Sequence, residues 1–135
     1  MGGAKETFVD RVATLLSPAT AKAYARCLAN PLGEVATLEH ETRSYLKQVE
    51  DRATEAEFLD LETARTAAEG CLTLIERLGC SPNVARQRAV QAAVDYFVEE
   101  DDGENDNSIV GFDDDLEVVR VTAEVLGWPI SEDTA

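Results

Sequence analysis

The sequence predicts an all-α fold, a single compact bundle of five to six helices with an acidic loop before the last helix. Apolar residues recur at helical spacing along most of the chain, and Pro and Gly stand mainly between these stretches. No alternating pattern typical of a strand continues beyond four residues. The chain has 135 residues, of which 44% are hydrophobic, which suits one packed core. We expect one helical domain over residues 1–129 and a frayed tail over 130–135.

A Ser–Pro pair separates the first two predicted helices. The apolar face of the first comprises Phe8, Val12, Leu15 and Leu16. Pro18 suits the first turn of the second helix, because an N–H at that position has no helical acceptor. The second helix is expected to end at Asn30–Pro31, and its inner face comprises Ala19, Ala23, Cys27 and Leu28.

The next two helices have longer apolar repeats. The third follows a turn at Leu32–Gly33, and its predicted face comprises Val35, Leu38, Thr42, Tyr45, Leu46 and Val49. The fourth is predicted to begin with a capping box at residues 54–57 and to end at Gly79. Its predicted stripe comprises Phe58, Leu61, Arg65, Ala68, Leu72 and Ile75. Cys71 also lies on an apolar stripe of this helix.

The fifth helix is predicted to begin with Ser81 as N-cap and Pro82 in the first turn. Its face comprises Ala85, Ala89, Ala92, Ala93, Tyr96 and Phe97. The last helix is expected to begin at residues 113–115, three aspartates that the helix dipole favours there, and to stop at Gly127. Its inner face comprises Leu116, Val119, Ala123 and Leu126. Short turns between the second, third, fourth and fifth helices predict antiparallel neighbours.

The overall charge excludes several classes of function. The chain has 27 Asp and Glu against 12 Lys and Arg, a formal net charge of −15. Direct nucleic-acid binding is not expected, because few cations are present to displace counterions from phosphates. No apolar run approaches the roughly 20 residues of a membrane span, and the first residues lack the apolar stretch of a secretory signal. These features predict a cytoplasmic protein without a membrane partner.

The acidic residues are concentrated in one segment, residues 95–117, which we call the acidic segment. It contains 11 of the 27 acidic residues and no Lys or Arg, so it carries −11 of the net charge. One interpretation is a solvated loop that aids solubility, and another is an anionic surface that docks on a basic protein partner. The candidate binding residues are Asp101, Asp102, Glu104, Asp106, Asp113, Asp114 and Asp115.

A divalent cation is the third interpretation of the same segment. Ca²⁺ and Mg²⁺ prefer clustered carboxylate oxygens, and Asp102, Asp114 and Asp115 are the candidate ligands. No register of the loop meets the ligand spacing of an EF-hand. No other cofactor is indicated, because Cys27, Cys71, Cys80 and His40 lack the paired spacing of a zinc site. We interpret the cysteines as small core residues in a reducing cytoplasm.

Residues 89–127 resemble the YkvA-like domain of unknown function. The similarity rests on Tyr96–Val98, an Asp-containing loop, and a Gly-x-x-Asp-Asp element that opens an apolar helix. That element comprises Gly111, Asp114 and Asp115, with Val118 and Val119 as the apolar pair that follows. The loop aspartate of the family would fall at Asp101 or Asp102. The resemblance implies a helix, an acidic loop and a second helix, and it implies no established reaction.

The preferred hypothesis is a small interaction or accessory protein that docks a basic partner through the acidic segment. Trp128 is a candidate anchor beside it, although a lone Trp after a helix more often packs on its own core. The alternatives are a divalent-cation-binding domain and a nucleic-acid-mimicking inhibitor. Catalysis is disfavoured, because the sequence has no glycine-rich phosphate loop, nucleophile elbow or metal-ligand helix pair.

Overall fold

The computed structural model describes residues 7–53, 61–79, 83–98 and 113–128. These residues form six helices and no strand, so the predicted all-α bundle is confirmed. The helices are α1 (Phe8–Leu15), α2 (Pro18–Cys27), α3 (Val35–Ala53), α4 (Leu61–Leu78), α5 (Val84–Val98) and α6 (Asp113–Leu126). The predicted loop at 99–108, the capping box at 54–57 and the tail at 130–135 lie outside the described residues.

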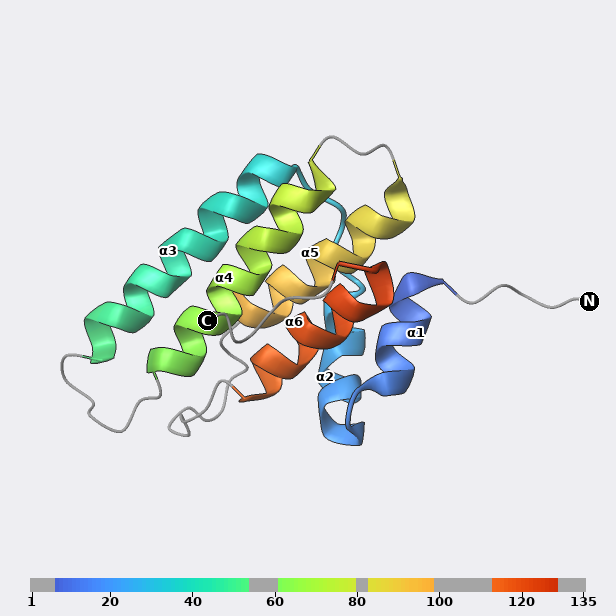
Figure 1. Cartoon of the computed structure of the whole chain (residues 1–135), viewed down its shortest axis with the longest axis horizontal. Coiled ribbons are helices and arrows are strands. Elements are labelled where there is room, and N and C mark those ends of the chain that lie inside the picture. Colours follow the sequence, from blue (N-terminus) through green and yellow to red (C-terminus); the bar gives the residue numbers. More distant parts are fainter. Residues whose placement is uncertain (1–6, 54–60, 80–82, 99–112, 129–135) are drawn as a thin grey trace, which may run out of the picture.

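Helix α5 is the central element of the bundle, because it packs against each of the other five helices. The α3–α4 hairpin lies on one side of it and the short helices α1 and α2 lie on the other (Figure 1). Helix α6 packs against α1, α4 and α5 and also contacts α2. The end of α5 and the start of α6 therefore lie next to each other. In sequence they flank residues 99–112.

The prediction that α2 and α3 are antiparallel neighbours is wrong. No contact between these two helices is found, and both pack on α5 instead. Residues 28–34, which we call the 28–34 connection, join them along α5. Polar side chains of α5 bind the backbone of this connection, as described below. The length of the 28–34 connection does not predict this course of the chain, because α5 holds the connection in place.

The core is built from every helix, and its centre contains an edge-to-face aromatic pair. The rings of Tyr45 on α3 and Phe97 on α5 lie 5.0 Å apart between centroids with an interplanar angle of 89°. The completely buried side chains include Val12, Tyr24, Val49, Cys71, Leu74, Val90, Val94, Val118 and Val119. The predicted faces of α3 and α6 are thus largely confirmed.

Other predicted faces need correction. Leu15 is 60% exposed, and Ala19, Arg65 and Ala85 are also exposed. The inner face of α4 instead follows residues that are mostly small, namely Ala64, Ala67, Ala68, Cys71, Leu74, Ile75 and Leu78. Small side chains allow close helix approach, so the buried stripe is centred on alanines rather than on the largest apolar residues.

The helix ends have recognisable caps. Thr7 and Asp10 form a capping box at the start of α1, with N–O distances of 3.1 and 3.2 Å. Helix α5 begins at Val84 rather than at the predicted Pro82, and Asn83 Oδ1 accepts from the Arg86 N–H at 3.0 Å. The predicted stops are confirmed, since Gly79 and Gly127 have φ of 50° and 83°.

Candidate functional site

The structure describes part of the predicted site. Asp101, Asp102, Glu104 and Asp106 lie outside the described residues, so the proposed metal set Asp102, Asp114 and Asp115 is only partly placed. Asp113 is the first residue of α6, and Asp114 and Asp115 follow in the same turn, as the sequence predicted. Among the described residues, no group of three or more His, Cys, Asp or Glu could hold a metal ion.

Asp114 joins the start of α6 to the end of α5. Its Oδ2 accepts a hydrogen bond from the Tyr96 hydroxyl at 3.0 Å. Burial raises the pKa of Tyr96, and the charge of Asp114 and this hydrogen bond raise it further. Tyr96 therefore remains a neutral donor at physiological pH, and one carboxylate of the predicted site is occupied by an internal contact.

Asp115 is half-buried in the first turn of α6. Burial raises the pKa of Cys71, a thiol with no exposed surface, and the negative charge of Asp115 raises it further. Burial, followed by the like charge of Asp114, raises the pKa of Asp115 well above its usual value. This carboxyl therefore differs from its neighbours, because its surroundings disfavour its charge.

Glu117 caps α2 from the opposite helix, a role that the sequence analysis did not predict. Its Oε2 accepts from the Ser17 N–H at 2.8 Å, and its Oε1 accepts from the Ser17 hydroxyl at 3.2 Å. Ser17 makes no side-chain cap of its own, and the first turn of α2 has no acidic residue. Glu117 supplies the negative charge that this helix end favours.

Asp95 is held in the same way at the other end of the acidic segment. Its Oδ2 accepts from Asn30 Nδ2 at 3.0 Å and from Gln91 Nε2 at 3.3 Å. Asp95, Asp114 and Glu117 thus each receive a hydrogen bond from another part of the protein. The two ends of the acidic segment are tied to the bundle by some of their own carboxylates.

The 28–34 connection is bound by a polar stripe on α5. Gln91, which is 4% exposed, accepts from the Gly33 N–H at 2.7 Å and donates to the Pro31 carbonyl at 2.7 Å. Gln87 Nε2 donates to the Gly33 carbonyl at 2.9 Å. Arg88 Nη1 donates to the Asn30 carbonyl at 2.6 Å and to the Leu28 carbonyl at 3.4 Å.

Trp128 packs beside Arg86 and on the hydrophobic core. The Arg86 guanidinium carbon lies 5.6 Å from the centroid of the Phe8 ring and 5.5 Å from that of Trp128. Trp128 also packs against the hydrophobic core. It follows the last turn of α6, whereas Asp114 lies in the first, so the helix separates them. The core-packing role is confirmed, and the suggestion of an anchor beside the acidic segment stays a prediction, because residues 99–112 lie outside the described residues.

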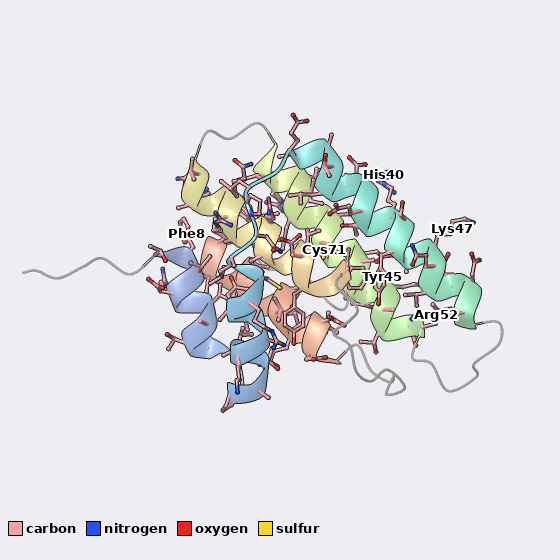
Figure 2. All side chains as sticks on the ribbon, turned by 180° about the vertical axis from the view of Figure 1, so that it is seen from behind. Phe8, His40, Tyr45, Lys47, Arg52 and Cys71 are labelled. Carbon is pink, nitrogen blue, oxygen red and sulfur yellow. The ribbon has the colours of Figure 1, made fainter. Side chains whose placement is uncertain are left out.

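The cysteines and the histidine do not form a joint site in the described residues. Cys27 and Cys71 are buried free thiols, as predicted, and Cys80 lies outside the described residues. Figure 2 shows Cys71 inside the bundle, whereas His40, Lys47 and Arg52 project from the outer side of α3. A nucleophile–histidine pair of Cys71 and His40 is therefore not assembled.

No protein-family model matches the sequence of this chain. Comparisons with curated proteins and with solved structures also give no significant match. The resemblance of residues 89–127 to the YkvA-like domain stays a prediction. In the described residues, no helix is long and apolar enough to cross a membrane.

Proposed function

We propose that the protein is a small cytoplasmic accessory protein whose acidic segment docks a basic surface of a partner protein. The observation that supports this most is the concentration of 11 acidic residues, without a single Lys or Arg, in residues 95–117. A cluster of this kind attracts and orients a cationic partner, and the attraction accelerates association.

The hydrogen bonds at both ends of the acidic segment also support the docking proposal. Asp95 is bound through α5 and Asn30, and Asp114 and Glu117 are bound to Tyr96 and Ser17. Six further acidic residues stand between these ends in sequence, at positions 99–106. Two packed helices thus hold both ends of this strongly charged stretch of sequence, which reduces the conformational entropy that binding must overcome.

The cytoplasmic location in this proposal is supported by the cysteines. Cys27 and Cys71 are free and buried, in helices that do not contact one another. Buried thiols that form no disulfide with one another are typical of a reducing compartment such as the cytoplasm.

A quantitative binding experiment tests the docking function with a labelled deca-lysine peptide. In the acidic-loop variant, Asp101, Asp102 and Asp106 become Asn and Glu104 becomes Gln. We expect the affinity, measured by fluorescence anisotropy at about 50 mM salt, to fall about tenfold. Wild-type binding should weaken steeply when the salt is raised to about 500 mM, because exposed charges are then screened.

The matched control removes the same number of charges elsewhere. It replaces four exposed glutamates by glutamine at Glu41, Glu69, Glu76 and Glu124. If net charge alone drives binding, both variants lose affinity equally and the docking function is wrong. A local docking site leaves the control within about twofold of wild type.

Divalent-cation binding is a second candidate, favoured by the adjacent carboxylates of Asp114 and Asp115. Each charge disfavours the other, and a cation between them would offset that repulsion. Thermal melts with Ca²⁺ or Mg²⁺ distinguish this function, because an ion that binds only the folded state raises the melting temperature, and the rise grows with the ion concentration relative to its Kd. A shift of several degrees that Asp115→Asn abolishes would favour the cation over the partner protein. The nucleic-acid mimic finds no added support, because most of the net negative charge is concentrated in one segment.

A further inference from the structure

One arginine near the start of α5 lies over two aromatic rings that come from two other helices. The guanidinium carbon of Arg86 is 5.6 Å from the centroid of the Phe8 ring and 5.5 Å from that of Trp128. Phe8 is the first residue of α1 and Trp128 follows the end of α6, so three helix ends meet at one end of the bundle (Figure 1). Both rings are partly buried and pack on the core. The half-buried side chain of Arg86 is therefore held against apolar rings.

The guanidinium of Arg86 has hydrogen-bond donors that the protein does not use. Its Nε is buried and has no acceptor among the described residues. In the same part of the chain, no carboxylate forms an ion pair with Arg86. The first turn of α5 has no acidic residue, and Asp10, on the same turn of α1 as Phe8, is engaged in the capping box with Thr7. A buried N–H without an acceptor is unfavourable, so an acceptor supplied by a ligand would be bound at this point.

Other arginines of the bundle show the difference. Arg88, two residues later on α5, donates to the Asn30 carbonyl at 2.6 Å. Arg65 on α4 forms an ion pair with Glu50 at 3.1 Å. Oxygen atoms of the protein thus accept from these two guanidinium groups, whereas Arg86 has aromatic rings beside it and a buried donor without an acceptor.

We propose that Arg86, Phe8 and Trp128 form a binding site for a small monocarboxylic acid with an apolar body. The guanidinium donates two N–H groups to the carboxylate oxygens, and the rings contact the apolar body. The buried Nε becomes accessible when one of the two partly buried rings turns aside. The single positive charge balances a monocarboxylate, whereas a phosphate dianion would keep an uncompensated charge beside apolar rings. The net charge of −15 also repels a polyanionic peptide.

The carboxylate site does not depend on the docking function. Arg86 lies near the start of α5, whereas the acidic segment begins with Asp95 near the end of the same helix. Loss of binding at one place therefore leaves the other to be measured separately.

Intrinsic fluorescence tests the carboxylate site, because Trp128 is the only tryptophan of the chain. Butyrate is titrated into the wild-type protein near neutral pH, and chloride keeps the ionic strength constant. We expect a saturable change in emission with a Kd on the order of 1–10 mM. Arg86→Gln should weaken binding about tenfold, because it removes a charge-assisted pair of hydrogen bonds. Arg86→Lys should weaken it about threefold, because Lys keeps the charge and lacks the planar fork.

Arg77→Gln is the matched control, because it removes one exposed positive charge from α4. Its Kd for butyrate should stay within about twofold of wild type. Thermal melts show whether each variant folds, and Arg86→Lys decides the test where Arg86→Gln does not fold. Wild-type emission that does not saturate, or equal weakening by the Arg77 and Arg86 variants, would overturn the carboxylate site. Tighter binding of inorganic phosphate or of a hexa-glutamate peptide than of butyrate would contradict the assignment of its ligand.

Discussion

Two polar junctions on α5 differ in what holds them together. Near the middle of the helix, Gln87, Arg88 and Gln91 bind backbone groups of the 28–34 connection. Near its C-terminal end, Tyr96 meets the carboxylates at the start of α6, which we call the α6 junction. The first junction matches neutral amides and an arginine to backbone groups, whereas the second brings several anions close together. The comparison indicates that losing a side chain at the first junction leaves buried backbone groups without partners, whereas the exposed carboxylate of Asp114 at the second can turn to water.

The largest effect is expected at the first junction, from Gln91→Leu. Leucine keeps approximately the same volume, but the Gly33 N–H and the Pro31 carbonyl both lose their partner. Because Gln91 is almost completely buried, we expect the free energy of unfolding to fall by about 2–3 kcal/mol. Urea denaturation measures this change, and an unchanged m-value would show that the denatured state is unaffected.

Gln87→Leu is the matched control for this prediction. Gln87 lies one turn earlier on the same helix, is only half-buried, and makes a single hydrogen bond to the Gly33 carbonyl. We expect a loss of about 1 kcal/mol. Equal losses in the two variants would mean that water replaces the Gln91 contacts, and the 28–34 connection would not depend on this side chain.

These junctions also explain which parts of the fold could be predicted from the sequence. Apolar periodicity identified the helices, and Gly79 and Gly127 marked helix ends because a positive φ favours glycine. The path between α2 and α3 was missed because side-chain hydrogen bonds to backbone groups have no periodic pattern. Asn30–Pro31 and Gly33 look like an ordinary turn in sequence, and only the structure shows Gln91 bound to them.

The candidate site, like the fold, could be predicted only in part from the sequence. Three consecutive aspartates correctly predicted where α6 begins, because the helix dipole favours them there. The sequence did not show that Glu117 and Ser17, which are 100 positions apart, would meet. It also did not show that Asp115 would be half-buried, since its burial depends on how α6 is rotated against the bundle. Sequence spacing places residues on a helix, whereas long-range packing decides which carboxylates remain available to a partner.

An intermediate effect is expected at the α6 junction from Glu117→Gln. The amide keeps one acceptor for Ser17 but removes the negative charge from the N-terminal end of α2. We expect a loss of about 1 kcal/mol in the free energy of unfolding, and the loss should shrink at high salt. The control is Glu124→Gln, an exposed glutamate two turns later on α6, whose removal should change stability by less than about 0.5 kcal/mol. A loss that is equally large for Glu124→Gln would attribute the effect to net charge and not to the contact with Ser17.

The smallest effect is expected from Tyr96→Phe, which removes only the hydroxyl that donates to Asp114 and also hydrogen-bonds with Thr20. The ring keeps its packing against the core, and the freed carboxylate can turn to water, so we expect a loss of about 0.5 kcal/mol. This variant gives the clearest contrast between the two junctions. Removing the polar group of Gln91 leaves backbone groups without a partner, whereas removing the Tyr96 hydroxyl does not. A double-mutant cycle with Asp114→Asn measures the Tyr96–Asp114 pair directly, and a coupling near zero would show that it contributes nothing to the α6 junction. A coupling above about 2 kcal/mol would contradict the comparison itself, because the α6 junction would then be as firmly held as the 28–34 connection.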